Sequence, residues 1–258
     1  MIGALNIKGA NSPSSLYKWD LIIRKMKRDQ IGILCISETH MDATLELLLR
    51  NKHPSFCIIH TYDPDHTQAN GVAVIINTNL MQTEPTNISI LKPGHALSLT
   101  IDEPLSFLLN LLAVYAPNVT STGSENAEFW RELEATLHSQ NQRIHLLLGD
   151  CNIVEEATDR LPLRPDAWQA ISALQSLCNQ MNLEDGWRKS NPYPEKQYTF
   201  GHNTGTHMSH IDRIYASPEI LDQAQRWNIE PPGLPTADHQ LVSVELYNDA
   251  VTEIGQGR

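Results

Sequence analysis

Short apolar runs, separated by polar segments, recur along the whole chain and predict many β-strands. A strand is expected where about four to eight residues are apolar or alternate between apolar and polar. The strands predicted in this way cover residues 2–7, 31–36, 56–61, 71–77, 88–91, 96–101, 106–115, 144–149, 198–200, 210–216 and 241–246. The last run alternates between apolar and polar residues, so we expect that strand to be half exposed.

Four other segments carry apolar residues at helical spacing, namely residues 16–26, 42–51, 125–137 and 168–181. Trp19, Trp130 and Trp168 lie on the apolar faces of three of these helices and are expected in the core. The helices do not alternate strictly with the strands, which favours two packed sheets with helices outside them. We therefore expect one α/β domain at residues 1–247, followed by a polar C-terminal tail at residues 248–258.

Composition narrows the class of protein. The chain has 258 residues, of which 41% are hydrophobic, enough for a sizeable core. No apolar run reaches the roughly 18 residues of a membrane span, and no secretory signal is visible at the N-terminus. The cysteines have no close metal-binding spacing, so we expect reduced and mostly buried thiols of an intracellular protein: Cys35, Cys57, Cys151 and Cys178.

The net charge of −11 argues against a general nucleic-acid binder, because such proteins gain affinity from basic side chains on phosphates. It leaves room for an enzyme that gathers acidic ligands around a metal ion and keeps a local basic rim. Five basic residues in predicted loops are candidates for that rim: Arg160, Arg164, Arg188, Lys189 and Arg213.

The stretch from Ile144 to Asn152 is the most informative one. An apolar run closed by Gly149 predicts a buried strand, and Asp150 and Asn152 follow at its end. Side chains at i and i+2 point the same way if the extended geometry persists, which would aim a carboxylate and a carboxamide at one place. A strand followed by an ordinary Asx turn explains the same residues, and both readings stay open.

Several other predicted strands end in polar side chains, and the full set is Asn6, Glu38, Tyr115, Asp150, Asn152, Asp212, Asp238 and His239. Any one of them can cap a helix or form a turn. Together they would share a small volume at one end of a sandwich, where the carboxylates repel one another unless a cation is present. Oxygen ligands without cysteine select Mg²⁺, Mn²⁺ or Ca²⁺ over zinc, and such a cleft with a histidine suits phosphoryl chemistry.

These residues stand in short motifs whose order resembles that of the endonuclease/exonuclease/phosphatase superfamily: Leu5-Asn6, Ser37-Glu38-Thr39-His40, Tyr115-Ala116-Pro117-Asn118, Gly149-Asp150-Cys151-Asn152, Tyr198-Thr199-Phe200, Ser209 to Ile214 and Ala237-Asp238-His239. The resemblance covers about residues 2–247. It implies a DNase-I-like fold, a four-layer α/β sandwich of two packed, mainly antiparallel sheets flanked by helices. Residues 183–188 and 209–215 look like the endonuclease domain of LINE-type non-LTR retrotransposons.

The resemblance also implies roles. Glu38 would be the principal ligand of Mg²⁺, with Mn²⁺ as a plausible substitute, Asn6 would lie beside it, and Asp238 would lie near a second or alternate metal position. Asp212 would orient His239, Asp150 would orient or deprotonate the attacking water, Asn152 would hold a phosphate oxygen, and Tyr115 would donate to the phosphate or to the leaving oxygen. Asn118, Thr199 and Ser209 would line the substrate cleft.

Two positions depart from the pattern. Lys8 stands where some repair-type relatives carry an acidic residue, which weakens the case for an abasic-site enzyme. His210 stands where an arginine is expected in LINE-type sequences, so the grip on phosphate is expected to be weaker or dependent on pH.

The predicted function is therefore a metal-dependent phosphodiesterase, a DNA endonuclease that nicks one strand and leaves a 3′-hydroxyl. DNA is the expected partner and no membrane is, and a nuclear location follows if the chain serves a retrotransposon. The parent element would carry a reverse transcriptase domain that this chain lacks. The alternatives are an abasic-site repair nuclease, a phosphatase of the same fold and a non-catalytic retrotransposon remnant.

Overall fold

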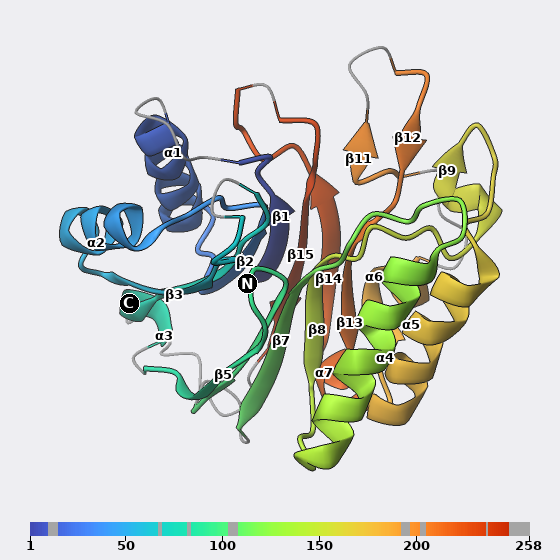
Figure 1. Ribbon diagram of the computed structural model, residues 1–258. Helices are drawn as coiled ribbons and strands as arrows, with labels where there is room; N and C mark the ends of the chain where they lie inside the picture. Colours follow the sequence, from blue (N-terminus) through green and yellow to red (C-terminus); the bar gives the residue numbers. More distant parts are fainter. Residues whose placement is uncertain are drawn as a thin grey trace, which may run out of the picture.

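The computed structural model describes residues 1–9, 15–66, 69–81, 84–102, 108–191, 197–201, 205–235 and 237–247. The polar tail expected at residues 248–258 lies outside the described residues. Two six-stranded sheets packed face to face form the centre of the molecule (Figure 1).

The first sheet has the strand order β14-β15-β1-β2-β4-β3. Its strands are β1 (Ile2–Asn6), β2 (Ile33–Ser37), β3 (Phe56–Thr61), β4 (Val72–Asn77), β14 (Ala224–Glu230) and β15 (Leu241–Leu246). β1 and β2 run parallel, and the other neighbours are antiparallel.

The second sheet has the order β10-β13-β8-β7-β6-β5. Its strands are β5 (Thr86–Lys92), β6 (Ala96–Ile101), β7 (Leu109–Tyr115), β8 (Leu146–Asp150), β10 (Glu184–Asp185) and β13 (Asp212–Ala216). Again one pair, β7 and β8, is parallel. A small third sheet of β11 (Phe200–Gly201), β12 (Met208–Ser209) and β9 (Arg160–Leu161) lies at one end of the sandwich (Figure 1).

Helices form the two outer layers (Figure 1). α1 (Ser15–Arg28) and α2 (Ala43–Lys52) cover the first sheet, and α4 (Ser124–Ser139) and α5 (Trp168–Met181) cover the second. Shorter elements are α3 (Thr78–Met81), η1 (Ala157–Asp159), α6 (Gly186–Ser190) and α7 (Pro218–Gln223). The predicted four-layer α/β sandwich, mainly antiparallel and DNase-I-like, is therefore confirmed.

The central strands are apolar on both faces because each face is covered. In β2, Ile33 and Cys35 pack into the core between the sheets, while Leu34 and Ile36 pack against α1 and α2. All four cysteines are free thiols, and burial raises the pKa of Cys35 to about 12. No helix in the described part of the chain is long and apolar enough to cross a membrane.

Two expectations about burial were wrong. Trp19 and Trp130 are fully buried, but Trp168 is 71% exposed, because it stands at the first residue of α5, where none of the described elements covers it. The first four residues of β15 are buried, not half exposed, because β15 lies between β1 and β14 inside the first sheet.

Candidate active site

The polar strand-end residues of the sequence gather at one end of the sandwich. Asn6, Tyr115 and Asp150 are the last residues of β1, β7 and β8, and Asp212 is the first residue of β13, where it pairs in register with Asp150. Beside them lies a cleft of about 340 Å³, and Asp150 is the one of these four residues that lines it. Its lining residues are Lys8, Glu38, Asn118, Val119, Asp150, Asn152, Arg160, Phe200, Ser209, Ile211, Asp238 and His239.

Sharp turns in the backbone aim several of these side chains. Lys8, Glu38 and Asn152 all have positive φ, at 51°, 51° and 50°, a conformation that costs a non-glycine residue on the order of 1 kcal/mol. Each of these three residues follows the end of a strand. The backbone therefore turns sharply at the end of the sandwich where the polar side chains come together. Gly149 has a φ of +140°, and a Cβ at this position would lie 2.0 Å from the carbonyl oxygen of Val114. Only glycine therefore allows the backbones of β7 and β8 to approach this closely.

Asp150 and Asn152 both line the cleft, but not through extended geometry. The backbone N–H of Asn152 donates to Oδ1 of Asp150 at 2.9 Å, which is an Asx turn. Its side-chain amide donates to the carbonyl of Ala116 at 2.9 Å. The two interpretations of this stretch, an Asx turn and a pair of site residues, are therefore compatible, because the turn itself brings both side chains to the cleft.

Asn6 organises one side of the cleft as a donor. Its amide nitrogen donates to Oε1 of Glu38 at 2.9 Å and to Oδ2 of Asp150 at 2.8 Å. Its amide oxygen accepts the backbone N–H of Lys8 at 2.8 Å. In this arrangement Asn6 holds the two carboxylates in place through its N–H groups, while its amide oxygen is directed toward the backbone of Lys8.

Glu38 keeps one oxygen open. The hydroxyl of Tyr115 donates to its Oε1 at 2.9 Å, as Asn6 does, and no described residue donates to Oε2. Burial and the charge of Glu38 raise the pKa of Tyr115 well above its ordinary value, so this phenol remains a proton donor. The carboxylate of Glu38 is thus fixed in orientation with one oxygen available to a cation.

Asp212 and His239 form a buried pair. Nδ1 of His239 lies 2.8 Å from Oδ2 of Asp212. Burial alone lowers the pKa of His239, but the charge and hydrogen bond of Asp212 outweigh it and raise the pKa to about 9. His239 is therefore an imidazolium at neutral pH, with its Nε2 side available to the cleft.

Asp150 has a carboxyl group that can exchange a proton near neutrality. Its burial and the negative charge of Asp212 raise the pKa to about 7, although the charge of His239 and the hydrogen bond from Asn6 act in the opposite direction. A base with a pKa near the working pH is suited to take a proton from water.

The oxygen atoms of the cleft fit a hard divalent ion. Oδ1 of Asp212 and Oδ1 of Asp238 are buried, and neither has a hydrogen-bond partner among the described residues. Ligand atoms of Asp150, Asp212 and His239 all lie within 4.8 Å of one another. Unpartnered buried carboxylate oxygens are costly without a cation, and carboxylate oxygens of this kind suit Mg²⁺ or Mn²⁺.

The three residues expected to line the substrate cleft differ in position. Asn118 is exposed and Ser209 is buried, and both line the cleft. Thr199 is fully buried instead, and its hydroxyl accepts the backbone N–H groups of Ile211 and Asp212 at 3.0 and 2.9 Å. Thr199 therefore positions the start of β13, which carries Asp212, and does not line the cleft.

Sequence reasoning missed Phe200 in this cleft. Its ring lies 4.9 Å from the ring of His239, centroid to centroid. The signal was available, because Phe200 belongs to the same short motif as Thr199.

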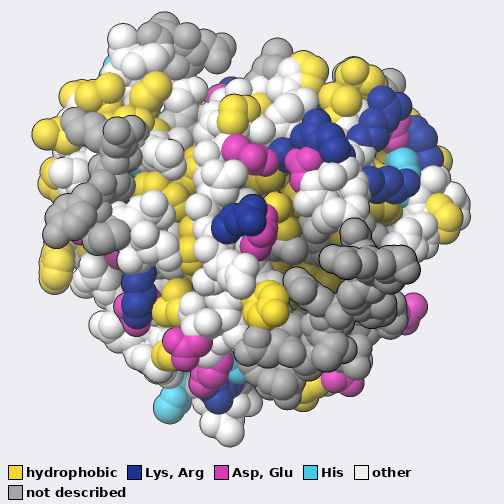
Figure 2. All heavy atoms as spheres, turned by 180° about the vertical axis from the view of Figure 1, so that it is seen from behind, with side chains coloured by type: hydrophobic (Ala, Val, Ile, Leu, Met, Phe, Trp, Pro, Cys, Tyr) yellow, Lys and Arg dark blue, Asp and Glu magenta, His cyan; other side chains and the backbone are white. Residues whose placement is uncertain are grey.

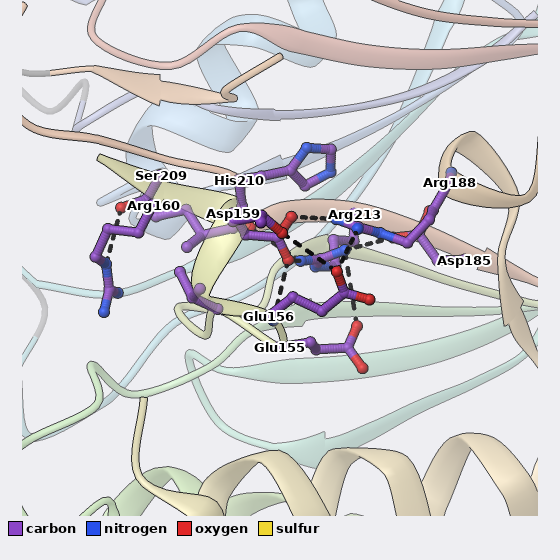
Figure 3. A network of polar contacts seen from close by, with 12 residues as sticks. Glu155, Glu156, Asp159, Arg160, Asp185, Arg188, Ser209, His210 and Arg213 are labelled. Atoms are coloured by element: carbon purple, nitrogen blue, oxygen red, sulfur yellow. Dashed lines mark hydrogen bonds and ion pairs between the residues drawn. The ribbon is translucent and has the colours of Figure 1, made fainter. Parts of the chain in front are cut away.

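The expected basic rim was wrong for most of its members, because nearby acidic residues pair with them (Figure 3). Arg213 is fully buried in β13, with its guanidinium 2.5 Å from Asp185 and 2.7 Å from Asp159. Arg188 pairs with Asp159 and Glu156. Burial raises the pKa of Asp159, but the charges of Arg213 and Arg188 outweigh this and lower it.

The remaining members of the expected rim are at the surface. Arg160 lines the cleft and is held by Asp166 at 2.5 Å, with Nε donating to Ser209 at 3.3 Å. Lys189 pairs with Glu184, and Arg164 is exposed without an ion pair to any described residue.

Basic side chains also gather over α1 on the face seen in Figure 2, which is turned by 180° from the view of Figure 1. Lys25 and Arg28 both pair with Asp29 there, at 2.8 and 2.5 Å. This cluster is largely neutralised by its acidic neighbours and lies outside the cleft.

His210 does not line the cleft, so the structure gives it no direct contact with a phosphate bound there. Its side chain is buried against the ring of Trp187, and Nδ1 lies 3.0 Å from the carbonyl oxygen of Gln197. Burial and the neighbouring charge of Arg213 lower its pKa to about 4, so the ring is neutral at physiological pH.

The sequence matches one protein family, and the fold matches several solved structures. The sequence profile of the Endonuclease/Exonuclease/phosphatase family matches residues 4–239. The 3′-5′ exonuclease NExo from Neisseria meningitidis superposes with a TM-score of 0.77 at 16% identity, over 95% of this chain and 98% of that chain. NExo from Neisseria, described as a 3′ phosphatase, has also been solved bound to a product DNA hairpin.

Two further structures have the same fold. The AP endonuclease LMAP from Leishmania major has a TM-score of 0.77 at 13% identity, over 94% of this chain and 86% of that chain. The endonuclease domain of TRAS1, a telomere-specific non-LTR retrotransposon, has a TM-score of 0.67 at 12% identity, over 96% and 98%. A search of curated protein sequences found no match.

Proposed function

We propose that this chain, which belongs to the Endonuclease/Exonuclease/phosphatase family, is a divalent-metal-dependent DNA endonuclease that nicks one strand and leaves a 3′-hydroxyl. The observation that carries the proposal is the buried pair of Asp212 and His239 beside Asp150, in the same cleft as Glu38. Hydrolysis of a phosphodiester needs a proton donor, a base and a ligand for a metal ion close together. His239, Asp150 and Glu38 supply these three groups.

The proposed reaction assigns a task to each group. Asp150 takes a proton from the attacking water, whose oxygen bonds to phosphorus as the bond from phosphorus to O3′ breaks. His239 donates a hydrogen bond from its imidazolium to a phosphate oxygen, and the leaving O3′ takes up a proton from the solvent to become the 3′-hydroxyl. Asn152 at the cleft wall supports the same phosphate.

Glu38 would hold Mg²⁺ or Mn²⁺ through its open Oε2, and the ion when bound supplies positive charge against the developing charge on phosphate. Tyr115 and Asn6 keep that carboxylate in one orientation through their hydrogen bonds to Oε1. Because these donors occupy Oε1, the second oxygen is the one presented to the cation.

DNA is the proposed substrate despite the acidic chain. Lys8, Arg160 and His239 line the cleft and offset its carboxylates locally. The similarity to the TRAS1 domain supports a retrotransposon endonuclease, in which a reverse transcriptase would extend the new 3′-hydroxyl in the nucleus.

Nicking of supercoiled plasmid at low salt tests the proposal. The wild-type chain is expected to nick with Mg²⁺ and not with EDTA, and His239→Ala is expected to lose nicking. His66→Ala is the matched control, because His66 is an exposed histidine that contacts Asp63 away from the cleft. Extension of the nick by a DNA polymerase checks for the 3′-hydroxyl.

Absence of nicking by a protein that is folded by circular dichroism would contradict the proposal. Activity should also fall steeply with salt, since DNA binding releases counterions. A salt-independent activity would favour a phosphatase acting on small headgroups.

A further inference from the structure

Lys8 occupies a rigid turn directly after β1. Its backbone N–H donates to Oδ1 of Asn6, and the next residue, Gly9, donates its N–H to the carbonyl of Glu38 at 2.8 Å. The ammonium of Lys18 donates to the carbonyls of Ile7 and Gly9, both at 2.8 Å. The turn is thus held from two sides, which fixes where the Lys8 side chain enters the cleft.

The Lys8 side chain reaches across the cleft to Asp238. Nζ of Lys8 lies 2.6 Å from Oδ2 of Asp238, and the two residues are 230 positions apart in the chain. The other oxygen of Asp238 is buried and has no hydrogen-bond partner among the described residues. Lys8 is therefore the cation that accompanies Asp238, the residue before His239.

We propose that the Lys8 ammonium is a built-in cation of the cleft, which neutralises Asp238 where a further divalent ion would otherwise bind, so that the site takes a single divalent ion. The proposal rests on the proposed function, because it concerns the ion that the nuclease would use. It assigns to Lys8 control over the number and the affinity of bound ions.

The charges of the cleft support a single ion. The imidazolium of His239 accompanies Asp212, and the ammonium of Lys8 accompanies Asp238. Glu38 and Asp150 are the two remaining carboxylates, and Asn6 holds them side by side with neutral N–H groups. When both are ionised, their two negative charges are balanced by one divalent cation.

The exposure of Lys8 explains why its effect falls on metal binding and not on folding. Its side chain is 68% exposed, whereas that of Asp238 is 11% exposed. An ion pair with one exposed partner adds little to stability. The positive charge still repels a divalent cation a few ångströms away, and removing it is expected to tighten binding roughly tenfold.

Mn²⁺ binding to the full chain, measured by calorimetry without DNA, tests the proposal. We expect one Mn²⁺ per chain for the wild type, tighter binding by roughly tenfold for Lys8→Met, and a second ion for Lys8→Asp. Lys8→Met keeps most of the side-chain stem and removes the charge. Lys189→Met is the matched control, because Lys189 is an exposed lysine paired with Glu184 outside the cleft, and its binding should equal that of the wild type.

Binding of no Mn²⁺ or of two ions by the wild type would overturn the proposal, and so would an unchanged Mn²⁺ affinity in both Lys8 variants. If metal binding stays the same while KM for DNA rises in Lys8→Met, Lys8 binds DNA phosphates and the proposal is wrong. The assay contains no DNA, so a wild type that binds one ion but nicks nothing would refute the proposed function alone.

Discussion

Asp212 and His239 are joined by a buried hydrogen bond, with 2.8 Å between Oδ2 and Nδ1. Asp212 is itself fixed by the backbone, since its N–H donates to the hydroxyl of Thr199 and its residue pairs with Asp150 across β13 and β8. The pairing of β13 with β8 therefore fixes Asp212, and Asp212 in turn fixes the orientation of the imidazole. A carboxylate in this position also keeps the ring charged.

The first prediction concerns that charge. Asp212→Asn keeps the shape of the side chain and removes its charge, so the pKa of His239 should fall from about 9. At pH 8 the wild-type ring is protonated and the variant ring is largely neutral. We expect nicking to fall on the order of a hundredfold or more at pH 8 and by less at pH 6. NMR titration of the ring and plasmid nicking at both pH values check this.

Asp222→Asn is the control for that variant, because Asp222 is exposed on α7, away from the cleft. An equal loss of nicking at pH 6 and pH 8 would mean that Asp212 does not act through the charge of His239.

The second prediction concerns Tyr115. Tyr115→Phe removes the hydroxyl that donates to Oε1 of Glu38 but keeps the ring, which stacks on His95 at 5.9 Å. We expect nicking to fall by roughly ten- to a hundredfold with little change in stability. The pKa of Tyr115 is raised, so the wild-type pH profile should have no alkaline limb from this phenol.

Plasmid nicking from pH 6 to 10 and a urea titration measure both effects. Tyr17→Phe is the control, because Tyr17 is 58% exposed on α1. Wild-type activity in Tyr115→Phe would show that Asn6 alone suffices to orient Glu38.

Much of the fold was predictable because the inner strands are continuous apolar runs. The predicted bounds of β3, β6 and β15 equal those in the structure. β14 was missed, because this edge strand is largely polar and carries no apolar run. The two-residue strands β9 and β12 were missed as well, since pairing so short depends on neighbours distant in sequence.

The membership of the site was predictable from strand ends, but its contacts were not. The pairing of Lys8 with Asp238 depends on a left-handed turn and on two loops brought together by the fold. The same holds for Asn6, whose donor role follows from the direction of its amide. Arg213 follows a predicted site residue, yet its burial among three acids from two other segments leaves no pattern in the sequence.

The third prediction concerns this buried arginine. Arg213→Met leaves Asp159 and Asp185 without the guanidinium that neutralises them (Figure 3). Breaking a buried ion pair from one side costs about 3–5 kcal/mol, so we expect the free energy of unfolding in urea to fall by that amount. Nicking should fall as well, because Arg213 also donates to the carbonyl of His210 between Ser209 and Asp212.

Arg143→Met is the control for Arg213→Met, because Arg143 forms an exposed pair with Glu219. Such a surface pair contributes about 1 kcal/mol or less. Equal effects of the two substitutions would mean that the buried network does not stabilise the fold.

The fourth prediction concerns pH and His210. Its pKa is about 4 in the folded chain, below the ordinary value of 6.5. Between these two values the unfolded chain binds a proton that the folded chain does not, so stability falls as the pH is lowered through this window. The loss between pH 6.5 and 5 should be about 2 kcal/mol.

His210→Gln can keep a donor to the carbonyl of Gln197 but cannot titrate. Its free energy of unfolding, measured in urea at pH 7, 6 and 5, should decline less steeply than that of the wild type by about 2 kcal/mol over the window. All other titrating groups are common to both proteins, so the difference isolates His210. His66→Gln, at an exposed histidine, should follow the wild type. If the free energies of unfolding of all three proteins fall in parallel with pH, His210 is not buried as a neutral ring.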